Sequence, residues 1–154
     1  MKISLSRGKS SIIDDEDFPK ICGHAWMANT NNGSNWYAVA KIDGKMVKMH
    51  HIIMGRHDED FDHKDGDGLN NRKINLRPCT SAQNGWNRRK IKKKSSKFKG
   101  VHYCRRDKCF RSYIVFHGKK IFAGCFKDET EAAKSYDKKA RELYGEFCRT
   151  NFEE

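Results

Sequence analysis

Apolar and polar residues alternate most clearly in the C-terminal third of the chain. The runs "GVHYCRR", "CFRSYIVFHG" and "KKIFAGCF" (100–106, 109–118 and 119–126) predict three β-strands. Residues 128–145 have helical spacing instead, with Asp128 as N-cap and Gly145 at the C-terminal end. Ala132, Ala133, Tyr136, Ala140 and Leu143 form the apolar stripe of this predicted helix. A three-stranded sheet covered by one helix is therefore expected.

The pattern in the N-terminal part is less regular. Residues 1–57 predict short strands and turns, and Asp43-Gly44 divides two partly alternating runs as in a β-hairpin. We expect Trp26, Trp36 and Tyr37 to pack a small core. A capping box at Thr80 and Gln83 predicts a helix that carries Asn84 on one face.

A basic segment separates the two parts. Seven of the ten residues of "RRKIKKKSSK" (88–97) are Lys or Arg. Such a run is either a solvated linker or an arm that follows a nucleic-acid backbone. We therefore predict an α+β protein with one domain at 1–87, a linker at 88–97 and a second domain at 98–154.

The net charge of +12 and pI near 9.5 indicate a polyanionic partner, either nucleic acid or an anionic membrane surface. No apolar run approaches the ~20 residues that span a bilayer, and the first residues lack the apolar stretch of a secretion signal. We expect an intracellular protein with no membrane partner. The six cysteines form no Cys-x-x-Cys pair, which favours reduced, apolar cysteines over structural zinc.

The stretch "FDHKDGDGLNNRKINLR" (61–77) concentrates acidic, histidine and asparagine side chains. A calcium loop of the EF-hand type fails on spacing, because Leu69 stands where a ligand belongs in either possible register. Asp65 and Asp67 are expected in a turn, with Asn70 and Asn71 shaping the loop. A turn alone, however, does not account for the adjacent Asp62 and His63.

Metal-assisted hydrolysis of a phosphodiester explains these residues better. A carboxylate and an amide oxygen suit one Mg²⁺ ion, with Mn²⁺ as the alternative. A neighbouring histidine can act as general base at neutral pH. Because neighbours on a strand point to opposite faces, we expect a strand end or bulge at Asp62-His63.

The segment "FDHKDGDGLNNRKINLRPCTSAQNGWN", preceded by "KMVKMHHIIMG", resembles the DNA-nicking and homing branch of the HNH endonucleases, in the ββα-metal form. The resemblance implies that Asp62 and Asn84 bind the cation and that His63 is the general base. It also implies that Asn75 ties down the loop and so orients His63. At the position of the family's His-Arg pair this chain has His50-His51.

Residues 98–152 are similar to the plant ethylene-response-factor DNA-binding domain, through Gly-Val after the first aromatic residue, "FAGCF", "EAA", "SYD" and the closing "NF". In that family the sheet enters the major groove. The resemblance and the basic linker together give a set of expected DNA contacts: Arg88, Arg89, Lys90, Lys92, Lys93, Lys94, His102, Arg105, Arg111, Lys119 and Lys120.

These features predict a phage- or intron-type HNH endonuclease that nicks or cleaves double-stranded DNA in the cytoplasm of a bacterial host. One site per chain favours a monomer that nicks one strand, with a dimer as the alternative. A DNA-binding regulator without catalysis is the competing hypothesis. RNA binding is a third, weakened because no aromatic stacking platform of the usual RNA modules is evident.

Overall fold

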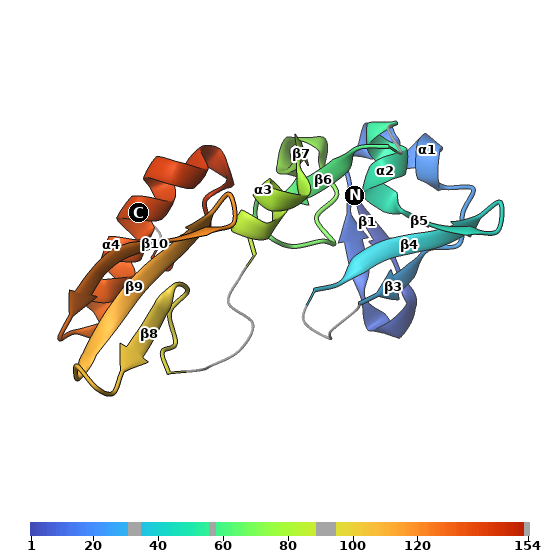
Figure 1. Ribbon diagram of the computed structural model, residues 1–154. Coiled ribbons are helices and arrows are strands. Elements are labelled where there is room, and N and C mark those ends of the chain that lie inside the picture. Colours follow the sequence, from blue (N-terminus) through green and yellow to red (C-terminus); the bar gives the residue numbers. More distant parts are fainter. Residues whose placement is uncertain (31–34, 56–57, 89–94, 153–154) are drawn as a thin grey trace. The chain divides into compact units, whose positions relative to one another are not determined.

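The computed structural model describes residues 1–30, 35–55, 58–88 and 95–152 (Figure 1). The chain divides into two compact units, Met1–Ser81 and Ala82–Glu154. Each unit combines small antiparallel sheets with short helices, so the protein is of mixed α+β class.

The strands of the N-terminal unit form hairpins and one three-stranded sheet. Strands β1 (Lys2–Ser4) and β2 (Ser10–Ile12) pair with each other, and β3 (Met27–Asn29), β4 (Tyr37–Ile42) and β5 (Lys45–Lys48) pair in that order. Asp43 and Gly44 connect β4 to β5, and both have positive φ, at 49° and 78°. The predicted hairpin is confirmed, because a two-residue turn of this kind requires positive φ at both positions.

Two short helices correct the expectation of strands and turns alone. Helix α1 (Phe18–Ile21) has a proline in its first turn, and α2 (Met49–Met54) follows β5 directly. Met49, His50 and Ile53 are the buried residues of α2, a helical spacing that six residues are too few to reveal in the sequence. Gly55 ends this helix in the left-handed conformation.

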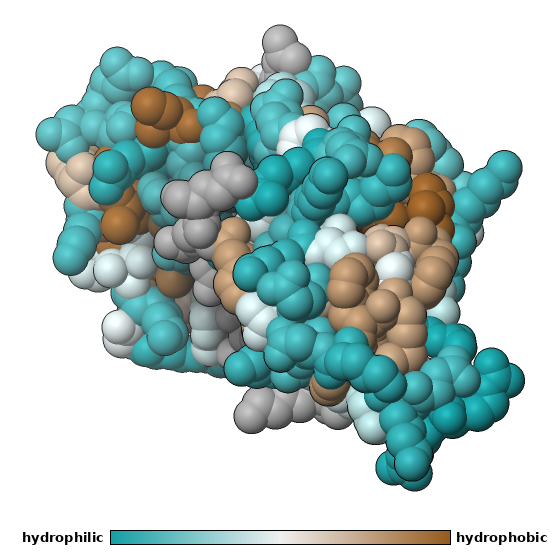
Figure 2. Space-filling model, turned by 90° about the vertical axis from the view of Figure 1, so that its left-hand side faces the viewer, coloured by the Kyte–Doolittle hydropathy of each residue, from teal (hydrophilic) through white to brown (hydrophobic). Residues whose placement is uncertain are grey.

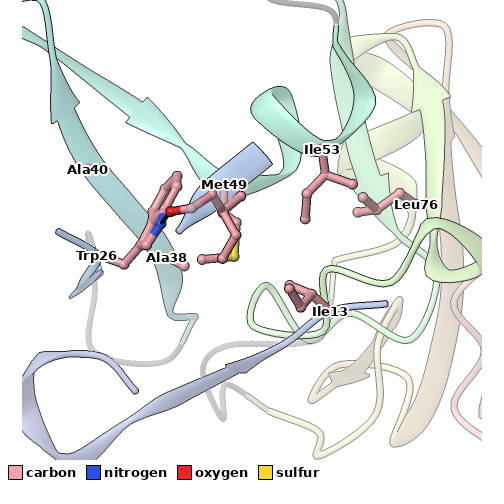
Figure 3. Packing of buried hydrophobic residues seen from close by; sticks show 8 residues of the cluster. Ile13, Trp26, Ala38, Ala40, Met49, Ile53 and Leu76 are labelled. Atoms are coloured by element: carbon pink, nitrogen blue, oxygen red, sulfur yellow. Dashed lines mark hydrogen bonds between the residues drawn. The ribbon is translucent and has the colours of Figure 1, made fainter. Parts of the chain in front are cut away.

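The N-terminal core is a cluster of eight buried side chains, Ile13, Ile21, Trp26, Ala38, Ala40, Met49, Ile53 and Leu76 (Figure 3). Figure 3 shows Trp26 and Met49 side by side, with Ile13, Ile53 and Leu76 completing the cluster. The indole of Trp26 donates a hydrogen bond to the Ile21 carbonyl oxygen at 2.9 Å. Trp26 thus has the predicted core role, whereas Trp36 is only half-buried and has the cations of Arg7 and Lys9 over its ring.

The rest of this unit is the hairpin of β6 (Asp60–His63) and β7 (Leu76–Cys79). The connecting loop includes a 3-10 turn at Lys73–Asn75. The loop also pairs with the start of the chain, because the Asn71 amide donates to the Ile12 carbonyl and the Ile12 amide donates to the Leu69 carbonyl. Helix α3 (Ser81–Trp86) comes next, and the division between the units falls after its first residue.

The C-terminal unit matches its predicted elements closely. Strands β8 (Val101–Cys104), β9 (Cys109–Phe116) and β10 (Lys119–Phe126) form a sheet in the order β10-β9-β8, against which α4 (Glu129–Tyr144) packs. Asp128 caps α4 by accepting hydrogen bonds from the amides of Thr130 and Glu131. Four residues of the predicted stripe are buried, and Leu143 is half-buried.

A disulfide corrects the expectation that every cysteine is reduced. Cys109 of β9 is bonded to Cys125 of β10, and Cys22, Cys79, Cys104 and Cys148 are free. The two bonded cysteines are 16 residues apart in sequence and become neighbours only when their strands pair. Spacing alone could not reveal this pairing.

Hydrophilic side chains cover most of the face shown in Figure 2, and apolar residues occur there as separate patches. Such a surface is expected of a chain in which 34% of the residues are charged. Within the described ranges, no helix has the length and apolar character needed to cross a membrane.

Candidate active site

Asp62 and His63 are the last two residues of β6. Their strand pairs with β7 in regular register, Asp62 opposite Arg77 and His63 opposite Leu76. The strand end expected at this position is therefore present, and the pairing contains no bulge. Because adjacent strand residues point to opposite faces, the carboxylate and the imidazole leave β6 in different directions. Each is only 5% exposed.

The loop after His63 is closed by Asn75. Its Nδ2 donates to Asp65 Oδ1 at 3.0 Å and to the Asn70 carbonyl oxygen at 2.8 Å, and its Oδ1 accepts from the Asp65 amide. Burial would raise the pKa of Asp65, but hydrogen bonds from the Asp67 amide, Asn70 and Asn75 outweigh it and lower that pKa. Asn75 and the ionised Asp65 thus hold the two ends of the loop together.

Gly68 lets this loop lie against the start of β4. A Cβ atom at position 68 would come within 2.4 Å of the Trp36 carbonyl oxygen and 2.6 Å of the Tyr37 ring. The backbone of the loop therefore touches β4 at a distance that only glycine permits.

The imidazole of His63 lies in a buried polar pocket of the N-terminal unit. Its Nε2 is 3.1 Å from Asn71 Oδ1, and the rings of His50 and Tyr37 have centroids 5.0 Å and 5.9 Å away. Burial lowers the pKa of His63, although the Asn71 hydrogen bond and the nearby carboxylates of Asp65, Asp62 and Asp67 oppose this effect. The imidazole is consequently neutral at pH 7 and has a lone pair that can accept a proton.

Asn71 is the residue that sequence reasoning missed at this site. It was expected only to shape the loop, yet it is fully buried and bonds the ring of His63. Its amide Nδ2 in turn donates to Ser11 Oγ, 60 residues away in sequence.

The Asp62 carboxylate is held by a second residue that the sequence did not single out. Arg77 donates to Asp62 Oδ2 from both Nη2, at 2.7 Å, and Nε, at 3.1 Å. The side chains of both partners are at most 10% exposed. Arg77 therefore fixes the orientation of the carboxylate from across the hairpin.

The remaining expected ligand, Asn84, lies in α3 and is half-buried. The structure groups Asp62, His63 and Asn75 in the N-terminal unit and counts Asn84 with the C-terminal one. Trp86 of the same helix stacks on Tyr144 of α4, with ring centroids 4.6 Å apart.

The donor chemistry fits a hard divalent cation of the magnesium type. In the described part of the chain, no group of three or more His, Cys, Asp or Glu side chains could enclose a metal. Mg²⁺ does not need such a cage, since it is usually held by one or two carboxylates together with water and substrate phosphates. Asp62 and one amide oxygen would be enough protein ligands if water and the phosphodiester supplied the rest.

Most of the basic residues in and beside the C-terminal sheet are exposed to solvent. His102, Arg105, Lys119 and Lys120 are exposed, and Arg111 is half-buried beside Asp107. Val101, Ser112 and Ile114 are buried in this unit, so alternation puts Arg111 and Tyr113 on the sheet face away from α4. Of the linker residues, Arg88 is exposed, whereas Arg89, Lys90, Lys92, Lys93 and Lys94 fall outside the described residues.

Aromatic rings support this face of the sheet. The ammonium of Lys120 lies 3.9 Å from the centroid of the Tyr113 ring, which also contacts Phe122 at 5.3 Å and His102 at 6.3 Å. Phe122 is 56% exposed. The face therefore presents cations around an apolar centre, a composition suited to phosphates and base edges.

Comparison with known proteins gives one informative relative. No protein-family model matches the chain. The chain is 31% identical over 156 aligned positions to a protein of Acanthamoeba polyphaga mimivirus named as an uncharacterized HNH endonuclease. The alignment covers 96% of this chain and 78% of the mimivirus protein.

Proposed function

The chain belongs to the HNH endonucleases, and we propose that it is a homing-type member that nicks double-stranded DNA by metal-dependent hydrolysis. The observation that carries the proposal is a buried His63 at a strand end beside Asp62, within a chain that aligns with a named HNH endonuclease along almost its whole length. The HNH resemblance of residues 61–87 supplies the roles of the individual residues.

In this mechanism His63 is the general base. Its neutral imidazole takes a proton from water as the oxygen attacks the scissile phosphorus, which leaves 5′-phosphate and 3′-hydroxyl ends. Asn75 keeps the loop closed behind the imidazole through Asp65 and the Asn70 carbonyl. We propose that the β6–β7 hairpin and α3 serve as the ββα-metal core of the family.

Asp62 and Asn84 are the proposed ligands of one divalent cation, Mg²⁺ or Mn²⁺. When bound, the cation supplies positive charge that stabilises the phosphate and the leaving oxygen. Arg77 holds the Asp62 carboxylate in one orientation. The carboxylate would therefore bind the cation without first losing side-chain freedom.

The C-terminal unit is proposed to bind the duplex through the outer face of its sheet, as the ethylene-response-factor resemblance implies. His102, Arg111 and Lys120 on this face would contact phosphates and base edges, with Arg105 added from the turn after β8 and Lys119 from the start of β10. The 88–97 segment would follow the backbone. We propose a monomer that cuts one strand per binding event in the cytoplasm of a bacterial host, with a phage or intron as its source.

A plasmid-nicking assay tests the proposal. The protein should convert supercoiled plasmid to the open-circular form with Mg²⁺ and should stop when EDTA is added. His63→Ala should lose about 10²- to 10⁴-fold in cleavage rate while retaining DNA affinity. A matched control is His24→Ala, which removes a histidine of the same unit that packs edge-on against Trp26.

The outcomes separate the competing functions. Absence of scission with every divalent cation, together with tight duplex binding, would favour the non-catalytic regulator. Cleavage by the His63→Ala variant at the parent rate would show that another group is the base. Mapping the cut positions on both strands of a defined duplex distinguishes a nick from a double-strand break.

A further inference from the structure

A continuous line of buried hydrogen bonds runs from the N-terminal strand β2 to the imidazole of His63. Ser11 Oγ is 2.9 Å from the Leu69 carbonyl oxygen, Asn71 Nδ2 is 2.7 Å from Ser11 Oγ, and Asn71 Oδ1 is 3.1 Å from His63 Nε2. Ser11 and Asn71 are both 0% exposed.

The direction of each bond follows from the donors and acceptors. The single hydroxyl proton of Ser11 is donated to the Leu69 carbonyl oxygen or to Met49 Sδ, which lies at 3.3 Å. The hydroxyl oxygen therefore accepts from the Asn71 amide group. The reverse amide orientation would bring Asn71 Oδ1 to the Leu69 carbonyl oxygen, which is 3.5 Å from the atom now assigned as Nδ2. Two acceptors would then face each other.

Asn71 therefore presents its amide oxygen Oδ1 to His63, and an amide oxygen can only accept a hydrogen bond. Neutral imidazole has one N–H, so the nitrogen that faces Asn71 must be the protonated one. The main chain holds this arrangement in place, because the backbone N–H of Asn71 donates to the Ile12 carbonyl oxygen at 2.7 Å.

We propose that Asn71, oriented by Ser11, is a positioning residue that keeps the proton of His63 on Nε2 and so makes Nδ1 the basic atom of the site. This inference rests on the proposed role of His63 as general base. Asn75 closes the loop, whereas Asn71 selects which ring nitrogen can accept a proton from water.

Nuclear magnetic resonance can read the tautomer directly. The full-length protein is labelled with ¹⁵N-histidine, and long-range ¹H–¹⁵N correlations identify the protonated nitrogen of His63. Resonances are assigned with the His63→Ala variant. The parent should show the Nε2–H form, and Asn71→Leu, which removes the acceptor, should show a mixture of forms. A parent protein with the proton on Nδ1 would overturn the inference.

Kinetics provide the second readout. Asn71→Leu should lower kcat for nicking by about 10- to 100-fold, with little change in KM for DNA, since substrate binding does not use this ring nitrogen. Asn71→Asp keeps an acceptor oxygen, and Ser11 can turn its hydroxyl to donate. This variant should recover most of kcat and the Nε2–H form.

Asn70→Ala is the matched control. It changes the neighbouring loop residue, which bonds Asp65 rather than His63, and should leave the tautomer unchanged. An Asn71→Leu variant with the parent's tautomer and kcat would refute the proposal. If Asn71→Leu does not fold, the tautomer of the parent protein and the activity of Asn71→Asp still test the proposal. Failure of the nuclease proposal is separate, because it appears as absent cleavage by the parent and leaves the tautomer measurement intact.

Discussion

The two units of the protein place their polar residues in opposite ways. In the N-terminal unit Asp62, His63, Asn71 and Asn75 are each no more than 8% exposed and bond one another or a neighbouring partner. In the C-terminal unit the basic residues of the sheet are largely exposed, and the buried side is apolar apart from a few groups.

The difference matches what the two proposed tasks demand. Catalysis needs groups fixed within fractions of an ångström and shielded from water, so their hydrogen bonds must be made inside the protein. Phosphate binding works through charge, which acts over a Debye length and tolerates mobile side chains. Substitutions should therefore affect mainly folding in one unit and mainly affinity in the other.

The largest loss of stability is expected when the buried ion pair between Asp62 and Arg77 is broken. Arg77→Met leaves the Asp62 carboxylate buried without its cation, and should lower the free energy of unfolding of the N-terminal unit by about 3 to 5 kcal/mol. Urea unfolding followed by hydrogen exchange in β6 and β7 measures it. Arg72→Met removes an exposed arginine from the loop of the same hairpin and is the control. Equal stability of the two variants would mean that the pair is not structural.

A loss of about 3 kcal/mol is expected in the other unit when the disulfide is removed. The Cys109→Ser/Cys125→Ser variant frees a link between residues 16 apart, which enlarges the unfolded ensemble of the C-terminal unit. Hydrogen exchange in β9 and β10 should accelerate, while exchange in β6 and β7 stays unchanged. Cys22→Ser, at an exposed free cysteine, should have no effect. Faster exchange in both units would contradict their independence.

Acid should weaken the N-terminal unit through His50. Burial, followed by repulsion from Lys48 and from His63 and His51 when these are protonated, lowers the pKa of His50 from 6.5 to about 2. The unfolded chain takes up this proton below about pH 6.5 and the folded unit does not, so stability is complete above that pH and falls as the pH drops. Between about pH 7.5 and pH 5 the loss due to His50 should be about 2 kcal/mol, and the lowered pKa of His63 adds a further loss of the same sign.

His50→Phe should reduce this pH dependence in urea titrations, leaving the part due to His63, and His24→Phe should not. A parent whose stability is the same at both pH values would show that His50 is protonated without cost in the folded protein.

The smallest effect of a single substitution is expected for the exposed basic residues of the C-terminal sheet, and it concerns DNA affinity. Each of Arg105→Gln and Lys120→Gln should weaken duplex binding a few-fold and reduce the slope of log affinity against log salt by about 0.9 if it removes one phosphate contact. Fluorescence anisotropy over a salt series measures both quantities. Lys41→Gln, an exposed lysine of β4, is the charge-matched control. An unchanged slope would remove the sheet from the DNA interface.

Local patterns were sufficient to predict much of the fold. The turn at Asp43-Gly44, the three strands from Val101 to Phe126 and the capped α4 all depend on residues close in sequence. Helix α2 escaped prediction because six residues give less than two turns of periodicity. The Cys109–Cys125 bond escaped because only strand pairing brings the two thiols together.

The candidate site could be predicted only in part for the same reason. Asp62, His63 and Asn75 stand out as residue types at a recognisable spacing. Their partners Ser11, Asn71 and Arg77 are ordinary residues whose roles come from long-range packing and cross-strand register. A sequence motif thus identifies the reacting groups more readily than the residues that orient them.

The bond between Ser11 and Asn71 also has a consequence for the order of folding. It spans 60 residues, so closing this contact costs more loop entropy than a bond within one hairpin, and we expect it to form after the local hairpins. A chain in which β2 has not docked on the loop would have the motif residues but would lack the buried Ser11–Asn71–His63 hydrogen bonds.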